Sequence, residues 1–235
     1  MKTNTSNNDK RIFYFLKFGN KENMTDLLEN GTIYFNTIEY FRKLEEQIAR
    51  GDKYEGTTNI KNYHEYDKLK LTLTIPETGK EIELNPNKFH LREFLTEIKG
   101  NLYSMYCIKS PDVMESDYKI DQRVKEFGTH FVIIKNVVKF LDLICEEIEK
   151  QDISYRAKIV KYYEKEKING EITLFDKSTE YEYQKEFRIV LYTNEIKPIA
   201  LKIGNLTEIA ELFEIKAIDD MKLEWTNKNG VEQRV

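Results

Sequence analysis

The sequence predicts a single α+β domain built on a mainly antiparallel, twisted sheet flanked by helices. Helical patterns are concentrated early, whereas the last third is rich in short strand-like runs, a segregation typical of α+β proteins. The chain has 235 residues, 40% of them hydrophobic and 33% charged, which is enough to bury a full core. It shows no repeat, low-complexity linker or proline-rich hinge. We therefore expect one domain over residues 11–235, preceded by a disordered polar tail over residues 1–10.

The first part of the chain predicts alternating strands and helices. Met24, Leu27 and Leu28 share one helical face, and Asn30-Gly31 supplies a stop after them. A second helix is expected to begin at an N-cap, Asn36. The expected elements are, in order, a buried aromatic strand (11–18), a helix (21–31), a strand (32–35) and a helix that ends near Gly51 (36–52).

Further along, one stretch alternates strictly between apolar and polar residues and predicts a hairpin with one wet face. Its apolar positions are Leu69, Leu71, Leu73 and Ile75 before a PETGK turn, and Ile82 and Leu84 after it. Continuous apolar runs then predict central strands at 101–109 and 129–135, and 136–150 carries the clearest amphipathic helix. The last third predicts strands at 155–163, 185–192, 197–203 and 222–225, with a short helical pattern over 203–213.

Charge and composition narrow the function classes. The net charge of −4 disfavours non-specific nucleic-acid binding, which needs a cationic face. Binding through a local basic groove is an alternative that the net charge does not exclude. The N-terminus has no apolar signal region, and no run approaches about 18 apolar residues. We therefore expect a cytoplasmic protein with no membrane association.

The cysteines and histidines give no strong site signal. Cys107 and Cys145 lie in apolar surroundings far apart in sequence, which is typical of reduced, buried thiols; a nucleophile or a disulfide is the alternative. His64, His90 and His130 are too scattered for a metal-ligand spacing. We predict no metal site and no bound cofactor.

One candidate segment is EYFRKLEEQIARGDKYEG, residues 39–56. Most of its charges lie off the apolar face, which is the pattern of a solvated helix with ion pairs. Its end, residues 50–56, is a compact polar turn in which two glycines bracket Asp52 and Glu55; these two residues and Arg50, just before the first glycine, are candidate ligand-binding residues. No phosphate-binding glycine motif occurs there.

The other candidate segment is YEYQKEFRIVLY, residues 181–192. In a strand, Glu186 and Arg188 share one face, and Phe187 with its apolar neighbours defines the opposite, core-facing side. The pair is either an ordinary cross-strand ion pair on an exposed face or part of a site. A metal-dependent nuclease that uses Asp52, Glu55 and Glu186 is a further alternative, although sequence spacing does not bring these acids together.

Several of these stretches carry a family resemblance. LLENGTIYFNTIEYFRKLEE, RGDKYEG, NLYSMYCI, FGTHFVIIKN and YEYQKEFRI resemble a group of uncharacterised bacterial and phage proteins of the DUF2971 type, over nearly the whole chain. A more distant similarity of layout connects the aromatic first strand, the LLENGTIYF helix end and the late YxxEFR strand with DarT-type ADP-ribosyltransferases. In those enzymes a glutamate on a late strand acts at the ribose of NAD.

The transferase resemblance implies roles for particular residues. Glu186 would be catalytic, and NAD would be the substrate rather than a bound cofactor. A guanidinium of Arg42, Arg50 or Arg188 would bind the pyrophosphate, and Tyr14 or Tyr34 would stack on nicotinamide. The implied setting is a defence or counter-defence system of a bacterium or phage.

The competing class is a non-enzymatic module that binds a nucleotide or a protein of the host or phage, such as a component of a host defence system. Abundant tyrosine is compatible with such an interaction surface. The position of Glu186 separates the classes, because an enzyme should place it in a concave pocket beside Arg188, whereas a binder can leave it on an open sheet face.

Overall fold

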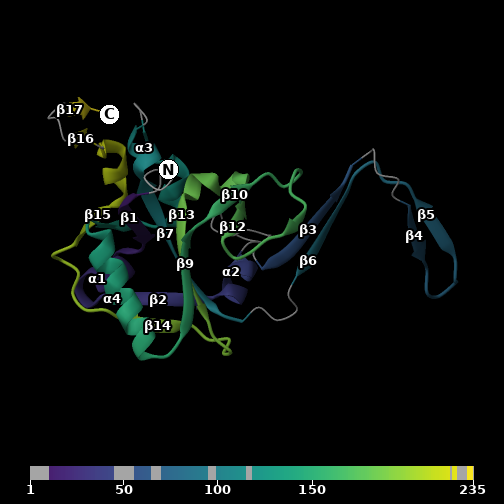
Figure 1. Cartoon of the computed structure of the whole chain (residues 1–235), viewed down its shortest axis with the longest axis horizontal. Helices are drawn as coiled ribbons and strands as arrows, with labels where there is room; N and C mark the ends of the chain where they lie inside the picture. The colour runs from purple at the N-terminus through teal and green to yellow at the C-terminus, as the bar shows by residue number, and fades with distance from the viewer. Residues whose placement is uncertain are drawn as a thin grey trace, which may run out of the picture.

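Strand β7 (Asn101–Lys109) lies at the centre of an eight-stranded sheet (Figure 1). The structure, a computed structural model, describes residues 11–44, 56–64, 70–94, 99–114, 118–222, 224–226 and 232–234. One edge of β7 pairs with β13 (Glu186–Tyr192), which pairs in turn with β9 (Ser154–Ile159). All pairings in this sheet are antiparallel, so the predicted α+β class with a mainly antiparallel sheet is confirmed.

The other edge of β7 forks into two branches. Strand β1 (Ile12–Gly19) pairs with the second half of β7, where Leu16 lies opposite Tyr106, and β8 (His130–Ile134) and β15 (Ala210–Glu214) extend that branch. Strand β2 (Thr32–Thr37) pairs with the start of β7, and β14 (Ile199–Lys202) extends this second branch. The described pairings leave residues 103–105 of β7 without a strand partner on this edge.

Helices cover one face of the sheet, and short segments cover the other. Helices α1 (Lys21–Asn30) and α4 (Val137–Lys150) pack on the first face. The buried residues of this largest core cluster include Phe15, Met24, Leu27, Met105, Phe140, Ile144, Phe187, Ile189 and Leu191. The second face carries two smaller apolar clusters, one around Leu16 and Tyr106 and the other around Leu102 and Val190. The polar site described below lies on this second face.

The remaining elements are short. The helices are α2 (Ile38–Leu44), α3 (Ser110–Met114) and the 3-10 helices η1 (Gln122–Phe127), η2 (Thr179–Gln184) and η3 (Ile215–Asp220). The strands are β3 (Thr57–Tyr63), β4 (Leu71–Thr74), β5 (Glu81–Leu84), β6 (Phe89–Phe94), β10 (Lys161–Tyr163), β11 (Gly170–Glu171), β12 (Asp176–Ser178), β16 (Glu224–Thr226) and β17 (Glu232–Arg234).

Local chemistry accounts for the two longest helices. Asn20 caps α1 through a hydrogen bond to the backbone N–H of Asn23, and Gly31 ends it in the left-handed conformation (φ 63°). A Cβ on Gly31 would lie 2.1 Å from the carbonyl oxygen of Gly204, so only glycine fits there. Helix α4 begins at Asn136, whose side chain accepts from the N–H of Lys139. Both predicted helices are confirmed.

Two helix predictions need correction. The segment expected to begin a helix at Asn36 continues strand β2 to Thr37, whose hydroxyl accepts from the N–H of Tyr40, so α2 is capped one residue later than predicted. The residues after Leu44 that were assigned to this helix lie outside the described residues. The stretch 203–213, which was expected to be helical, is irregular chain and a turn up to Ile209 and then enters strand β15, whose backbone groups are satisfied by pairing with β8.

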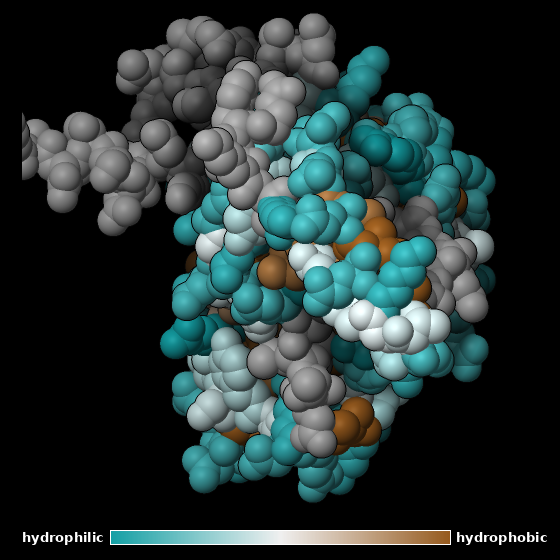
Figure 2. All heavy atoms as spheres, turned by 90° about the vertical axis from the view of Figure 1, so that its right-hand side faces the viewer, coloured by the Kyte–Doolittle hydropathy of each residue, from teal (hydrophilic) through white to brown (hydrophobic). Residues whose placement is uncertain are grey.

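An arm projects from the body of the protein (Figure 1). Strands β3 and β6 form its base with β11, and β4 and β5 form a separate two-stranded hairpin at its end. Leu73, Ile82 and Leu84 share one face of this hairpin, yet they are 55%, 39% and 41% exposed. Figure 2, viewed from the side on which the arm projects, shows apolar side chains open to the viewer among hydrophilic ones. The hairpin is therefore wet on both faces, not on one.

The structure bears on three other expectations: the lack of a membrane-spanning helix, the burial of the two cysteines, and the tail; Cys107 is buried as expected, whereas Cys145 is only partly buried. Among the described residues, no helix has the length and apolar character needed to cross a membrane. Cys107 and Cys145 are free thiols; burial raises the pKa of Cys107 to about 12, which makes it a poor nucleophile. The predicted tail over residues 1–10 is not among the described residues.

Candidate functional site

Strand β13 carries the predicted pair of charged residues on one face. Glu186 and Arg188 lie opposite Tyr106 and Ser104 of β7, while Phe187 and its apolar neighbours face the main core. The predicted division of the strand into two faces is thus correct. The expectation that the polar face is exposed is wrong, because Glu186 is 6% and Arg188 2% exposed. β13 is an inner strand, and residues of the chain between β11 and β13 cover its polar face.

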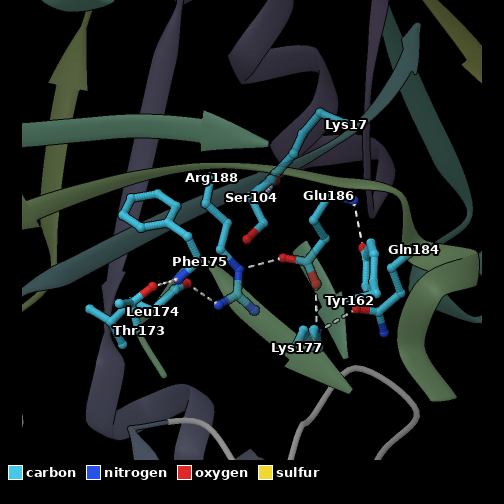
Figure 3. Close-up of polar contacts among 10 residues, drawn as sticks. All are labelled: Lys17, Ser104, Tyr162, Thr173, Leu174, Phe175, Lys177, Gln184, Glu186 and Arg188. Atoms are coloured by element: carbon cyan, nitrogen blue, oxygen red, sulfur yellow. Dashed lines mark hydrogen bonds and ion pairs between the residues drawn. The ribbon is translucent and has the colours of Figure 1, made fainter. Parts of the chain in front are cut away.

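Two cations hold the Glu186 carboxylate (Figure 3). Arg188 donates from Nε to Glu186 Oε2 at 2.7 Å, and Lys177 of β12 donates from Nζ to Glu186 Oε1 at 2.5 Å. Arg188 also donates from Nη1 to the carbonyl oxygen of Leu174 at 2.6 Å, and Lys177 donates to Gln184 Oε1 at 2.5 Å. All four polar groups are therefore satisfied inside the protein, as buried charges require.

The surrounding backbone fixes this arrangement. The N–H of Glu186 donates to the hydroxyl of Tyr162 at 2.9 Å, and its carbonyl accepts from the N–H of Val160 at 2.9 Å. Asp176 accepts hydrogen bonds from both the N–H and the hydroxyl of Thr173, which forms the turn that presents the Leu174 carbonyl to Arg188. Glu186 and Arg188 are thus positioned by local hydrogen bonds as well as by each other.

The electrostatic balance keeps Glu186 ionised. Burial by itself favours the neutral acid, but the positive charges of Arg188 and Lys177 and their hydrogen bonds outweigh that effect and hold the pKa of Glu186 below its ordinary value. With one carboxylate between two cations, the group of three carries a formal charge of about +1. Breaking a buried pair of this kind by removing one partner is costly, because it leaves an uncompensated charge.

The pair forms part of the wall of a cavity of about 140 Å³. Its polar wall comes from β13, Lys177, Gln184 and Ser104, and its apolar wall includes Phe18, Phe41 and Phe127. Lys17 adds a third cation, so three basic residues stand among the described lining residues, and two of them, Arg188 and Lys177, bind Glu186 directly. In a protein with a net charge of −4, this cavity is locally cationic and suits an anionic ligand that has a planar ring.

The fork in the sheet places Lys17 in this cavity. Where β1 and β2 separate, the Nζ atom of Lys17 donates to the carbonyl oxygen of Ser104 at 2.7 Å and lies 4.1 Å from the centroid of the Tyr103 ring. The ammonium group thus binds a β7 carbonyl at a position where the described strands leave this edge of β7 unpaired. The local opening of the sheet supplies both the space and one of its charges.

The other candidate residues do not gather around Glu186. Tyr14 is half-buried beside the cluster around Leu16, and Tyr34 is 53% exposed on β2. Arg42 forms an ion pair with Glu39 at 3.5 Å on α2. None of the three is among the described residues that line the cavity. Arg50, Asp52 and Glu55 lie outside the described residues.

Sequence reasoning missed the residues that complete the site. Gln184 stands two positions before Glu186 in YEYQKEFR, and this two-residue spacing is a signal from which Gln184 could have been predicted as part of the site. Lys17 is a lone basic residue in an aromatic strand, which is a weaker signal. Lys177 stands in an ordinary polar stretch, FDKST, and only its pairing on β12 next to Tyr162 brings it to the carboxylate.

The arrangement can perform two kinds of chemistry. A carboxylate that stays ionised in a cavity can stabilise a positive charge that develops on a bound sugar, and the neighbouring cations can hold a phosphate group. Among the described residues, no group of three or more His, Cys, Asp and Glu side chains could hold a metal ion.

The fold and the site define an α+β protein with a buried carboxylate between two cations at the wall of a small cationic cavity. Comparisons with protein-family models, with curated proteins and with solved structures found no match. The resemblances seen in the sequence therefore stay predictions.

Proposed function

We propose that this protein is an ADP-ribosyltransferase-like, NAD-processing enzyme that binds its nucleotide at the Glu186 cavity. The observation that carries the proposal is the Glu186 carboxylate itself, buried, held ionised and placed in the wall of a cavity with three cationic groups. The position of Glu186 in a concave site beside Arg188 is what an enzyme of this type requires.

The chemistry assigns a role to each kind of group. Cleavage of the bond between nicotinamide and the ribose sends the bonding electron pair to the nicotinamide nitrogen and leaves positive charge on the sugar. Glu186 would stabilise that charge, which is largest at the transition state. Arg188 or Lys17 would bind a phosphate oxygen, and a phenylalanine of the apolar wall would contact the ring. Water or an acceptor nucleophile then adds to the sugar carbon and loses a proton.

One observation favours a second candidate, a nucleotide-binding module without catalysis. Both oxygens of the Glu186 carboxylate already accept hydrogen bonds from cations, an arrangement that also suits a purely structural anion within a binding site. In either case we propose a cytoplasmic protein of a bacterial or phage defence or counter-defence system that acts on a host or phage component. This setting rests on the sequence resemblance.

The test is a titration of purified protein with NAD, followed by measurement of nicotinamide release. Glu186→Gln removes the charge and keeps the shape, and Glu182→Gln is the matched control, since Glu182 is exposed on η2 two residues from Gln184. We expect saturable NAD binding by all three proteins, with release reduced about 100-fold or more in Glu186→Gln alone.

Each other result has a defined meaning. If all three proteins bind NAD and none of them, wild type included, releases nicotinamide, the enzyme proposal is overturned and the binding module is supported. No binding at millimolar NAD would overturn NAD as the ligand. Equal release by the Glu186→Gln and wild-type proteins would remove Glu186 from the mechanism.

A further inference from the structure

Lys185, which precedes Glu186, has a backbone conformation that is unusual for its side chain. Its φ of 38° and ψ of 52° place it in the left-handed region, where a Cβ is unfavourable. Among the described residues, Asp152 is the other non-glycine residue with a positive φ, and it lies in the turn after α4. Left-handed residues with side chains persist only where surrounding contacts hold them.

Those contacts come from the end of β7 and from α3. The Nζ atom of Lys185 binds Oδ1 of Asp112 at 2.6 Å and lies 4.5 Å from the centroid of the Tyr118 ring. The Asp112 side chain is 5% exposed, and its Oδ2 accepts from the N–H of Lys109 at 2.9 Å. The Lys185 side chain is thus tied to a buried carboxylate that β7 itself fixes.

The Lys185 backbone is tied to two elements as well. Its N–H donates to the carbonyl oxygen of Glu182 at 3.0 Å, which closes η2, and its carbonyl accepts from the N–H of Cys107 at 2.9 Å, which joins it to β7. The chain therefore changes from η2 to β13 at this one residue. Gln184 before it and Glu186 after it both accept hydrogen bonds from the same ammonium group, that of Lys177.

We propose that Lys185 is a positioning residue, whose left-handed backbone, held by the ion pair with Asp112, directs the Glu186 carboxylate to Lys177 and Arg188 at the cavity wall. Lys185 is not among the described lining residues, so it acts through Glu186 and does not contact a ligand. The consequence for turnover rests on the proposed function, whereas the consequence for the position of Glu186 does not.

The first test follows the Glu186 carboxyl carbon by ¹³C NMR during a pH titration, with the signal assigned from its absence in Glu186→Gln. The groups that face this carboxylate are Arg188, Lys177, Gln184 and the hydroxyl of Tyr162. Because the first two hold it ionised, the wild-type signal should titrate below the ordinary glutamate value of about 4.3. A displaced carboxylate should titrate closer to that value.

Matched variants separate backbone positioning from general stability. A glycine at position 185 adopts a positive φ without strain, so the Glu186 signal of Lys185→Gly should titrate as in the wild type. A valine opposes this conformation, so Lys185→Val should raise the midpoint of the Glu186 titration. Asp112→Asn removes the ion pair with Lys185 and should also raise the midpoint of the Glu186 titration. This variant replaces Lys185→Val in the test if Lys185→Val does not fold. Asp152→Val is the control, because it places the same change at the other left-handed residue, away from the cavity.

A second readout uses turnover of NAD. Lys185→Val should lower kcat by about 10-fold or more with little change in KM, and Lys185→Gly should stay within about 3-fold of wild type. An unchanged Glu186 titration in Lys185→Val and Asp112→Asn would overturn the positioning role, whatever NAD does. If the Glu186 titration shifts in Lys185→Val and Asp112→Asn but the wild-type protein neither binds nor cleaves NAD, the positioning role of Lys185 is supported and the proposed function is overturned.

Discussion

Strand β13 and the β4–β5 hairpin both alternate polar and apolar side chains, yet β13 buries its polar row and the hairpin exposes its apolar row. On β13, Glu186 and Arg188 are almost completely buried. On the hairpin, Leu73 lies opposite Ile82 on one face, and both are exposed. Alternation decides which side chains share a face, but neighbouring elements decide which face is dry.

The neighbours of the two regions explain the difference. β13 lies between β7 and β9, with α4 in the core cluster on its apolar side and Lys177 of β12 on its polar side. The hairpin pairs only within itself, and two strands alone cannot enclose an apolar layer. The comparison predicts that similar substitutions should have large effects on β13 and small effects on the hairpin.

The largest effect is expected for Arg188→Ala. This change leaves the buried Glu186 carboxylate with Lys177 as its remaining cation and the Leu174 carbonyl without its donor, so we expect a loss of about 3–5 kcal/mol in the free energy of unfolding. Denaturant unfolding measures it. Arg156→Ala on β9 is the control, because Arg156 is exposed opposite Val190 and its loss should cost less than about 0.5 kcal/mol. Equal losses in the two variants would contradict the buried cluster.

A similarly large effect is expected for Leu191→Ala on the apolar side of β13. Leu191 is fully buried in the main core cluster, so removing its side chain should cost about 2–5 kcal/mol. Denaturant or thermal unfolding measures the loss. A cost below about 1 kcal/mol would show that this face is not packed as described.

A smaller effect concerns pH. The folded-state pKa of Glu186 is lowered by Arg188 and Lys177, so the carboxylate stabilises the fold above its unfolded pKa of about 4.3 and loses that contribution as pH falls toward the lower folded value. Glu186→Gln should be less stable than wild type near neutral pH, and the gap should narrow in acid. Unfolding free energies from about pH 7 to about pH 3 measure this, with Glu182→Gln, at an exposed position of η2, as the control. A gap that does not change with pH would contradict an ionised Glu186.

The smallest effect is expected for Leu73→Ala. Leu73 is 55% exposed on the hairpin, so the loss of its side chain should change the free energy of unfolding by about 0.5 kcal/mol or less. Leu191→Ala provides the matched leucine under the same conditions. A cost comparable to that of Leu191→Ala would mean that the apolar face of the hairpin is covered in solution.

Much of the fold could be predicted from local patterns. The aromatic first strand, the helix that ends at Gly31 and the helix that begins at Asn136 all follow from short-range chemistry, and each is present. Strand β15 could not be predicted in the same way, because the apolar spacing of residues 203–213 favours a helix, whereas residues from Ala210 onward pair with β8. Of the candidate site residues, Glu186 and Arg188 were correctly placed on one face, since strand periodicity alone sets that relation.

The sequence by itself determined the α+β class, the main helices and the side chains that share each face of β13, because these depend on propensity, capping and periodicity within a few residues. Only the tertiary structure decided that the polar face is buried, that Lys177 and Lys17 join Glu186, and that the hairpin stays exposed. These outcomes depend on contacts between residues far apart in the chain, such as the hydrogen bond from Lys17 to Ser104, which no local pattern encodes.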